Sequence, residues 1–176
     1  MIKYCFIKDE ESGLVQLGAG CSDEYYEAIG MKQRDVEQSE KDYQWYLTEK
    51  CPHYTEEEKF EIAKQNKIAE NDEIRDTALL SGVTYQNVLF DSDTDQKVNL
   101  LATVNMMSDT DTITWYGMDN QGLLCTKSDL MAIGGLITEL HSYCWNMNAY
   151  IKEQINNAQT MAELDRIEIS YDRYDT

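Results

Sequence analysis

The sequence has few basic side chains for its length. Fifteen Lys and Arg residues stand against 33 Asp and Glu residues, so the 176 residues carry a formal net charge of −18. Because a phosphate backbone is bound through clustered basic side chains, this composition argues against nucleic acid as a partner. Anionic membranes are disfavoured for the same reason. The acidic residues are spread along the chain and predict a solvated, self-repelling surface.

The sequence also lacks a long apolar run and a signal-peptide pattern. No apolar stretch reaches the length that spans a bilayer, and Met1-Ile2-Lys3-Tyr4 leads directly into strand-like alternation. The five cysteines are odd in number and far apart, which predicts thiols kept reduced rather than a disulfide framework. We therefore expect a protein made in the cytosol, or a virion protein assembled there.

With only two histidines, the chain offers little material for a metal site. Asp91, Asp93 and Asp95 resemble the start of a calcium loop, but Gln96 stands where that loop needs glycine and Ala102 where it needs glutamate. Helix capping explains the three acids without an ion, although an ion at this position stays open.

The other ligand-type side chains are too scattered to predict a site. His141 and Cys144, three apart on a predicted helix, supply only two ligands, and Cys51 and His53 lie in a distant segment. No local nucleophile–base motif and no phosphate loop are present. We therefore expect no cofactor, no metal and no catalytic residue, and hence a protein that is not an enzyme.

The chain divides into three predicted segments with an α+β fold. Residues 1–50 alternate in polarity and predict a small β-rich module, and Pro52, the only proline, marks its end. Residues 51–82 contain a capping box at Thr55 and predict a polar connector helix. Residues 83–176 predict antiparallel hairpins packed on a long helix.

Within the last segment, turn and capping residues separate the predicted elements. Short strands at 83–85 and 88–90 flank a Gln86-Asn87 turn, and strands at 112–116 and 123–125 flank a second turn. Between these hairpins, apolar residues at helical spacing predict a helix that ends near Met107. A capping box at Thr160 predicts a short last helix, followed at 167–171 by a strand or tail.

The long helix is predicted from Ser128 to about Ala158, on a heptad pattern of apolar residues. The positions of this seam are Leu130, Ile133, Ile137, Leu140, Cys144, Met147, Ile151 and Ala158. Gly134-Gly135 near its start suggests that another backbone passes close by. The seam can pack inside its own domain or also contribute to an oligomer. The candidate interaction residues are Ile133, Ile137, Leu140, Cys144, Met147 and Ile151, with Trp145 beside them.

A set of spaced short motifs follows residue 83. They are Val83-Thr84-Tyr85, Phe90-Asp91-Ser92-Asp93, Thr112-Ile113-Thr114-Trp115, Asp119-Asn120, Leu130, His141, Ala158-Gln159-Thr160 and Glu163-Leu164. In content and spacing, residues 74–170 resemble a bacteriophage tail-associated domain of uncharacterised function. That domain is found at the C-terminus of tail-fibre and tail-assembly proteins of phages and prophages. The first fifty residues are similar, more loosely, to N-terminal modules of small phage proteins and tail-fibre assembly chaperones.

The resemblance implies a non-catalytic role in a phage or prophage tail. The first hypothesis is a structural accessory of the fibre or baseplate that binds other tail proteins and itself, as a trimer or dimer. The alternative is a fibre assembly chaperone absent from the virion, and a second alternative is an acidic phage protein that binds a bacterial target. The expected location is the virion tail, or the host cytoplasm during assembly.

Overall fold

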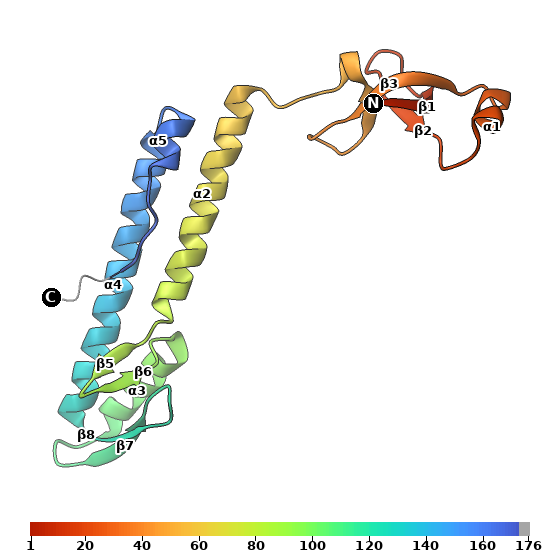
Figure 1. Ribbon diagram of the computed structural model, residues 1–176. Helices are drawn as coiled ribbons and strands as arrows, with labels where there is room; N and C mark the ends of the chain where they lie inside the picture. The colour runs from red at the N-terminus through yellow and green to blue at the C-terminus, as the bar shows by residue number, and fades with distance from the viewer. Residues whose placement is uncertain (173–176) are drawn as a thin grey trace. The chain divides into compact units, whose positions relative to one another are not determined.

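The computed structural model describes residues 1–172 (Figure 1). The chain divides into two compact units, Met1–Glu61 and Ile62–Thr176. The predicted α+β class is confirmed, because small antiparallel sheets accompany long helices. Within residues 1–172, none of the helices combines the length and the apolar character needed to cross a bilayer.

The N-terminal unit is built on a four-stranded antiparallel sheet of order β2-β1-β3-β4. Its strands are β1 (Ile2–Ile7), β2 (Val15–Leu17), β3 (Lys32–Gln38) and β4 (Trp45–Leu47). One face buries Cys5, Val15, Val36 and Leu47 as a small core. Alternate residues of a strand point to the same face, so the alternation seen in the sequence places these four together.

Two short helical elements complete this unit. Helix α1 (Asp23–Ala28) starts at Ser22, whose side chain accepts a hydrogen bond from the Tyr25 N–H. A 3₁₀ turn, η1 (Thr48–Lys50), follows β4. The chain after η1 runs beside the end of β3, where Ser39 Oγ donates to the Pro52 carbonyl at 2.9 Å. This hydrogen bond fixes the segment that carries the only proline.

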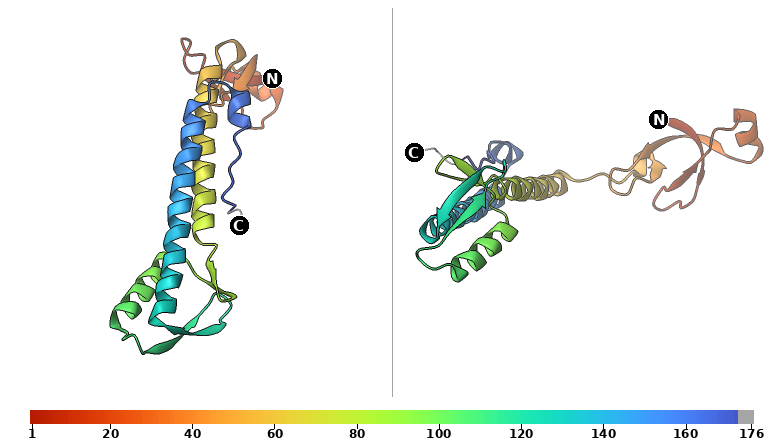
Figure 2. Two further views of the ribbon diagram at one scale, coloured as in Figure 1. Left: turned by 90° about the vertical axis from the view of Figure 1, so that its left-hand side faces the viewer. Right: turned by 90° about the horizontal axis from the view of Figure 1, so that it is seen from below.

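The C-terminal unit contains two long helices that lie side by side and run in opposite directions (Figures 1 and 2). They are α2 (Glu56–Leu79) and α4 (Lys127–Asn157). The predicted capping box at Thr55 is present, because Thr55 and Glu58 exchange side-chain to backbone hydrogen bonds. The unit boundary falls inside α2, so most of the helix expected as a connector forms part of the C-terminal unit. Helix α2 packs beside α4, which explains why most of it belongs to the C-terminal unit and does not form a separate connector.

Two β-ribbons and a helix lie at the end of the unit where α2 ends and α4 begins (Figures 1 and 2). The elements are β5 (Val83–Tyr85), β6 (Val88–Phe90), α3 (Thr94–Met106), β7 (Thr112–Tyr116) and β8 (Gly122–Thr126). Gln86 and Asn87 have φ of 48° and 64°, the left-handed conformation of a tight hairpin turn. The Met118 N–H donates to the Leu89 carbonyl at 2.8 Å, which joins the two ribbons.

Helix α4 begins one residue earlier than predicted and buries a wider stripe in its second half. A capping box between Thr126 and Asp129 starts it at Lys127 rather than at the predicted Ser128. The buried residues are Leu130, Ile133, Ile137, Leu140, Cys144, Asn148, Ile151 and Ile155. Past Cys144 the heptad prediction is confirmed for Ile151 and Ala158, whereas Met147 is only half-buried, and the unpredicted Asn148 and Ile155 are buried as well. An α-helix of 3.6 residues per turn drifts away from a seven-residue repeat.

The glycine pair of α4 has a different neighbour from the one predicted. A Cβ on Gly134 would lie 3.0 Å from Leu100 Cδ2, whereas a Cβ on Gly135 would meet nothing within 4 Å. The expected backbone approach is therefore wrong, and a side chain of α3 packs on Gly134 instead.

A short helix and an extended segment end the described chain. Helix α5 (Met161–Asp165) starts at Thr160, as predicted. The expected strand or tail at 167–171 is a tail, since no strand is assigned to it.

Candidate functional site

The seven predicted interaction residues lie on α4, and most of them are buried within the C-terminal unit. Ile133, Ile137, Leu140, Cys144 and Ile151 are buried, and Met147 is half-buried. This side of α4 serves intramolecular packing, since α4 contacts α3, β5 and β8 and is hydrogen-bonded to α2. A role of the same residues in an oligomer stays a prediction.

Trp145 stands apart from the other six. Its side chain is 53% exposed, and the Arg75 guanidinium lies over its ring at 4.3 Å from the centroid. This stacking is a cation–π contact between α4 and α2. Through this contact with Arg75, Trp145 lies beside a set of polar residues that links the two helices.

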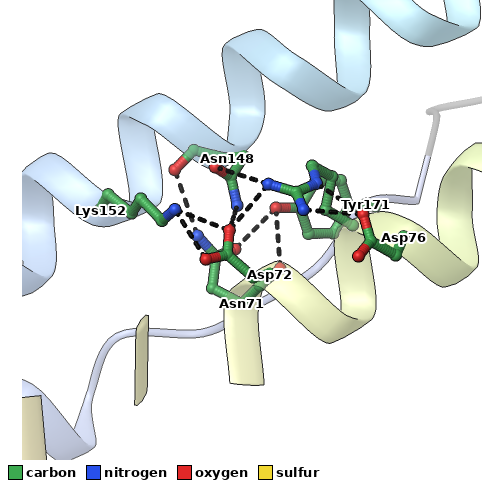
Figure 3. Close-up of polar contacts among 7 residues, drawn as sticks. Asn71, Asp72, Asp76, Asn148, Lys152 and Tyr171 are labelled. Atoms are coloured by element: carbon green, nitrogen blue, oxygen red, sulfur yellow. Dashed lines mark hydrogen bonds and ion pairs between the residues drawn. The ribbon is translucent and has the colours of Figure 1, made fainter. Parts of the chain in front are cut away.

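These polar residues form the site that the apolar pattern did not predict (Figure 3). We define the polar cluster as Asn71, Asp72, Arg75, Asn148, Lys152 and Tyr171. Asp72 is its centre: Oδ1 accepts from Arg75 Nη1 at 2.8 Å and from Asn148 Nδ2 at 3.0 Å, and Oδ2 accepts from Lys152 Nζ at 2.8 Å. One carboxylate of α2 thus binds two side chains of α4.

The most deeply buried part of the polar cluster joins three segments of the chain. Asn71 Nδ2 donates to the Asn148 backbone carbonyl at 3.1 Å, and Tyr171 Oη donates to Asn71 Oδ1 at 2.6 Å. Asn71 and Asn148 are both buried, although their side chains are polar. The segment after α5 is therefore attached to the middle of the helix pair (Figure 3).

The electrostatics of the polar cluster fit a structural role. The hydrogen bond from Lys152, followed by that from Asn148 and the charge of Arg75, holds the pKa of Asp72 below its ordinary value against the opposing effect of burial. Within residues 1–172, every buried side-chain nitrogen or oxygen has a hydrogen-bond partner. The polar groups of the cluster are hydrogen-bonded to one another, as expected of an arrangement that fixes helix register.

A second polar feature lies where α2 ends and α3 begins. A cavity of about 410 Å³ is lined by Leu79, Leu80, Ser92 and His141, with Asp76, Asp93 and Asp95 among its other lining residues. His141 Nε2 lies 2.8 Å from the Ser92 carbonyl oxygen, and Ser92 Oγ donates to the Leu79 carbonyl at 2.6 Å. His141 and Ser92 thereby connect α4, α2 and the chain leading into α3.

The aspartates at the start of α3 have a capping role. Asp93 is the N-cap residue, and its side chain accepts from the Gln96 N–H at 2.7 Å. Within residues 1–172, the ligand atoms of three His, Cys, Asp or Glu side chains come within 4.8 Å of one another only at Glu37, Cys51 and His53. Asp91, Asp93 and Asp95 do not form such a group.

Helix α3 has apolar side chains on both its buried side and its solvent-exposed side. Leu100 is buried, and Val104 and Met107 are half-buried against the unit. Val98 and Leu101, three residues apart on the other side, are 60% and 61% exposed. We call Val98 and Leu101 the α3 outer face. Sequence spacing alone does not show which of two apolar sides of a short helix is covered.

Comparison with protein families shows that a family model matches residues 62–170. The matching family is described as "Domain of unknown function (DUF4376)". The chain belongs to this family. No curated protein and no solved structure matches the chain.

The DUF4376 match begins at the residue where the C-terminal unit begins. It contains the α3 outer face, the His141 cavity and all of the polar cluster except Tyr171. The group of Glu37, Cys51 and His53 lies outside the DUF4376 match, in the N-terminal unit.

Proposed function

We propose that this protein is a non-enzymatic, tail-associated component of a phage or prophage, an accessory of the fibre or baseplate that acts through protein–protein contacts. Two lines of reasoning support the proposal. One is the resemblance of residues 74–170 to a tail-associated domain. The other is the form of the C-terminal unit, in which a fixed helix pair carries exposed apolar side chains at one end.

The α3 outer face is the observation that carries the proposal. Val98 and Leu101 keep most of their apolar surface in water although Leu100, between them in sequence, is buried. Leu124 and Tyr116 are also exposed on the β7–β8 ribbon at the same end of the unit (Figure 2). A group of exposed apolar side chains marks an interaction site more often than a polar surface does.

The rest of the unit suits the presentation of such a surface. The polar cluster joins α2, α4 and the terminal segment, which limits sliding of the helices and keeps the ribbon end in one arrangement. A surface that is already rigid loses less conformational entropy when a partner binds. The matching partner surface would be apolar at its centre. A basic rim would complement the acidic surroundings expected from a net charge of −18.

The test starts with the particle itself. Mass spectrometry of purified particles should detect the protein as a stoichiometric component, and its absence would overturn a structural role in favour of the assembly chaperone.

A Val98→Ser/Leu101→Ser double variant should be incorporated at a reduced level. Met161→Ser, which alters an exposed apolar residue of α5, should be incorporated normally. Equal incorporation of both variants would remove the α3 outer face from the proposal.

A further inference from the structure

Three side chains of different chemistry meet at the end of β3 in the N-terminal unit. Glu37 belongs to β3, Cys51 follows η1, and His53 is separated from Cys51 by Pro52. Each offers one ligand atom, and the three atoms lie within 4.8 Å of one another. His53 Nε2 is 3.8 Å from Glu37 Oε2. Thiolate, imidazole and carboxylate are the three ligand types that Zn²⁺ takes in proteins.

Two contacts between β3 with its following residue and the segment after η1 hold the backbone near these side chains. Cys51 Sγ is 3.9 Å from the Glu37 carbonyl oxygen, and Ser39 Oγ donates to the Pro52 carbonyl at 2.9 Å. Pro52 restricts its own φ and favours an extended conformation for the residue before it. Cys51 has this conformation, with φ of −62° and ψ of 124°. This extended segment brings both Cys51 and His53 close to Glu37.

The distances allow a tetrahedral ion after small rotations. Zinc bonds of about 2.0–2.3 Å place tetrahedral ligand atoms about 3.3–3.6 Å apart. The ligand atoms lie within 4.8 Å of one another, so they must close by at most about 1.5 Å. Cys51 is buried and fixed, whereas the Glu37 and His53 side chains are 44% and 51% exposed and can rotate. Their exposure also leaves a fourth position accessible to water.

The charge around the thiol favours a bound cation. The carboxylates of Glu37, Asp42 and Glu40 act electrostatically on the Cys51 thiol. Their negative charge attracts a divalent ion. As the metal–sulfur bond forms, the thiol proton is released to solvent and the thiolate becomes a ligand.

We propose that Glu37, Cys51 and His53 form a site for one zinc-class divalent cation. The ion joins β3 to the segment after η1. Because the ligands come together only in the folded unit, binding stabilises that unit.

Cobalt(II) titration of the full-length protein tests the site, since Co²⁺ takes the same ligands and absorbs light. One equivalent should produce a thiolate-to-metal charge-transfer band and the d–d bands of a tetrahedral ion, and Zn²⁺ should remove both. Cys51→Ser should abolish the charge-transfer band. His53→Gln or Glu37→Gln should weaken binding at least about 100-fold, since losing even an outer-shell partner costs about 10–100-fold. Cys21→Ser, which changes an exposed cysteine of the same unit, should leave binding unchanged.

Three results would overturn the proposal. These are a wild-type protein without the charge-transfer band, a band lost in Cys21→Ser, and wild-type affinity in both His53→Gln and Glu37→Gln. His53→Gln alters a half-exposed side chain, so it gives a decisive result even if Cys51→Ser does not fold. Circular dichroism of each variant separates loss of the site from loss of structure.

Discussion

Asn71 and Asn148 face each other in the buried interface between α2 and α4, with Asn71 Nδ2 donating to the Asn148 carbonyl at 3.1 Å. On each helix, apolar residues lie one turn before and one turn after the asparagine. Apolar packing alone would allow the helices to slide, whereas the amide hydrogen bond holds them in one register. A shift of either helix by one residue would separate donor from acceptor. Buried amides of this kind specify register at a cost in stability.

Asn71→Ala should strongly destabilise the C-terminal unit. It leaves Tyr171 Oη without its closer acceptor and the Asn148 carbonyl without this donor, at about 1–3 kcal/mol for each group left unpaired. Urea unfolding followed by fluorescence in a Trp45→Phe background measures it, because the remaining tryptophans lie in that unit. Asn105→Ala, on the exposed side of α3, should change the unfolding free energy by less than about 0.5 kcal/mol.

Tyr171→Phe should release the segment after α5 while preserving the helix pair. The change removes the hydroxyl that donates to Asn71, to Oδ1 at 2.6 Å and to the backbone carbonyl at 3.3 Å, at a cost of about 1 kcal/mol. Amide hydrogen exchange should accelerate in residues 166–172 and stay nearly unchanged in α4. Tyr150→Phe, at an exposed tyrosine, serves as the control, and equal exchange in both variants would contradict the prediction.

Asp72→Asn should lower stability at neutral pH and flatten its dependence on acid. The folded-state pKa of Asp72 lies below its ordinary value of 3.8. Its contribution is therefore complete above about pH 5 and is lost as pH falls through the folded-state pKa. The difference in melting temperature between the wild type and Asp72→Asn should shrink as the pH is lowered from about 6 to about 3. Glu153→Gln, at an exposed carboxylate of α4, should differ little from the wild type throughout.

The two neighbouring glycines of α4 should respond differently to alanine. Gly135→Ala adds a methyl group to open space within a helix and should stabilise the protein by about 0.5–1 kcal/mol. Gly134→Ala gains the same helix propensity but presses on Leu100 Cδ2, 3.0 Å from the new Cβ, so its net gain should be smaller or negative. Thermal melting of the two single variants measures the difference, and equal gains would place Leu100 farther from α4 than the structure does.

Local chemistry in the sequence was sufficient to predict most elements of the fold. The Gln86-Asn87 turn, the Thr55 capping box and the helix start at Thr160 each depend on a few consecutive residues, and the structure contains all three. The start of α4 differs by one residue from the predicted Ser128, because Thr126 is the N-cap and Asp129, three residues later, completes its capping box.

The candidate sites depend on contacts between distant residues, and local sequence patterns contain little sign of them. Asn71 lies three residues from both Ile68 and Ile74, a polar interruption of an apolar side that could have signalled a buried amide. Its partner Asn148 is 77 residues away, so the pairing required the helix register. Cys51 and His53 were noticed as possible ligands. Glu37 joins them only through the path of the chain beside β3.

The buried stripe of α4 constrains self-association. A left-handed three-stranded coil would pack along a seven-residue line such as Leu130, Ile137, Cys144 and Ile151. All four of these side chains are already buried inside the unit. Copies of the intact unit would therefore have to join through side chains that point away from α2, and engineering such a trimer would mean redesigning the solvent side of α4.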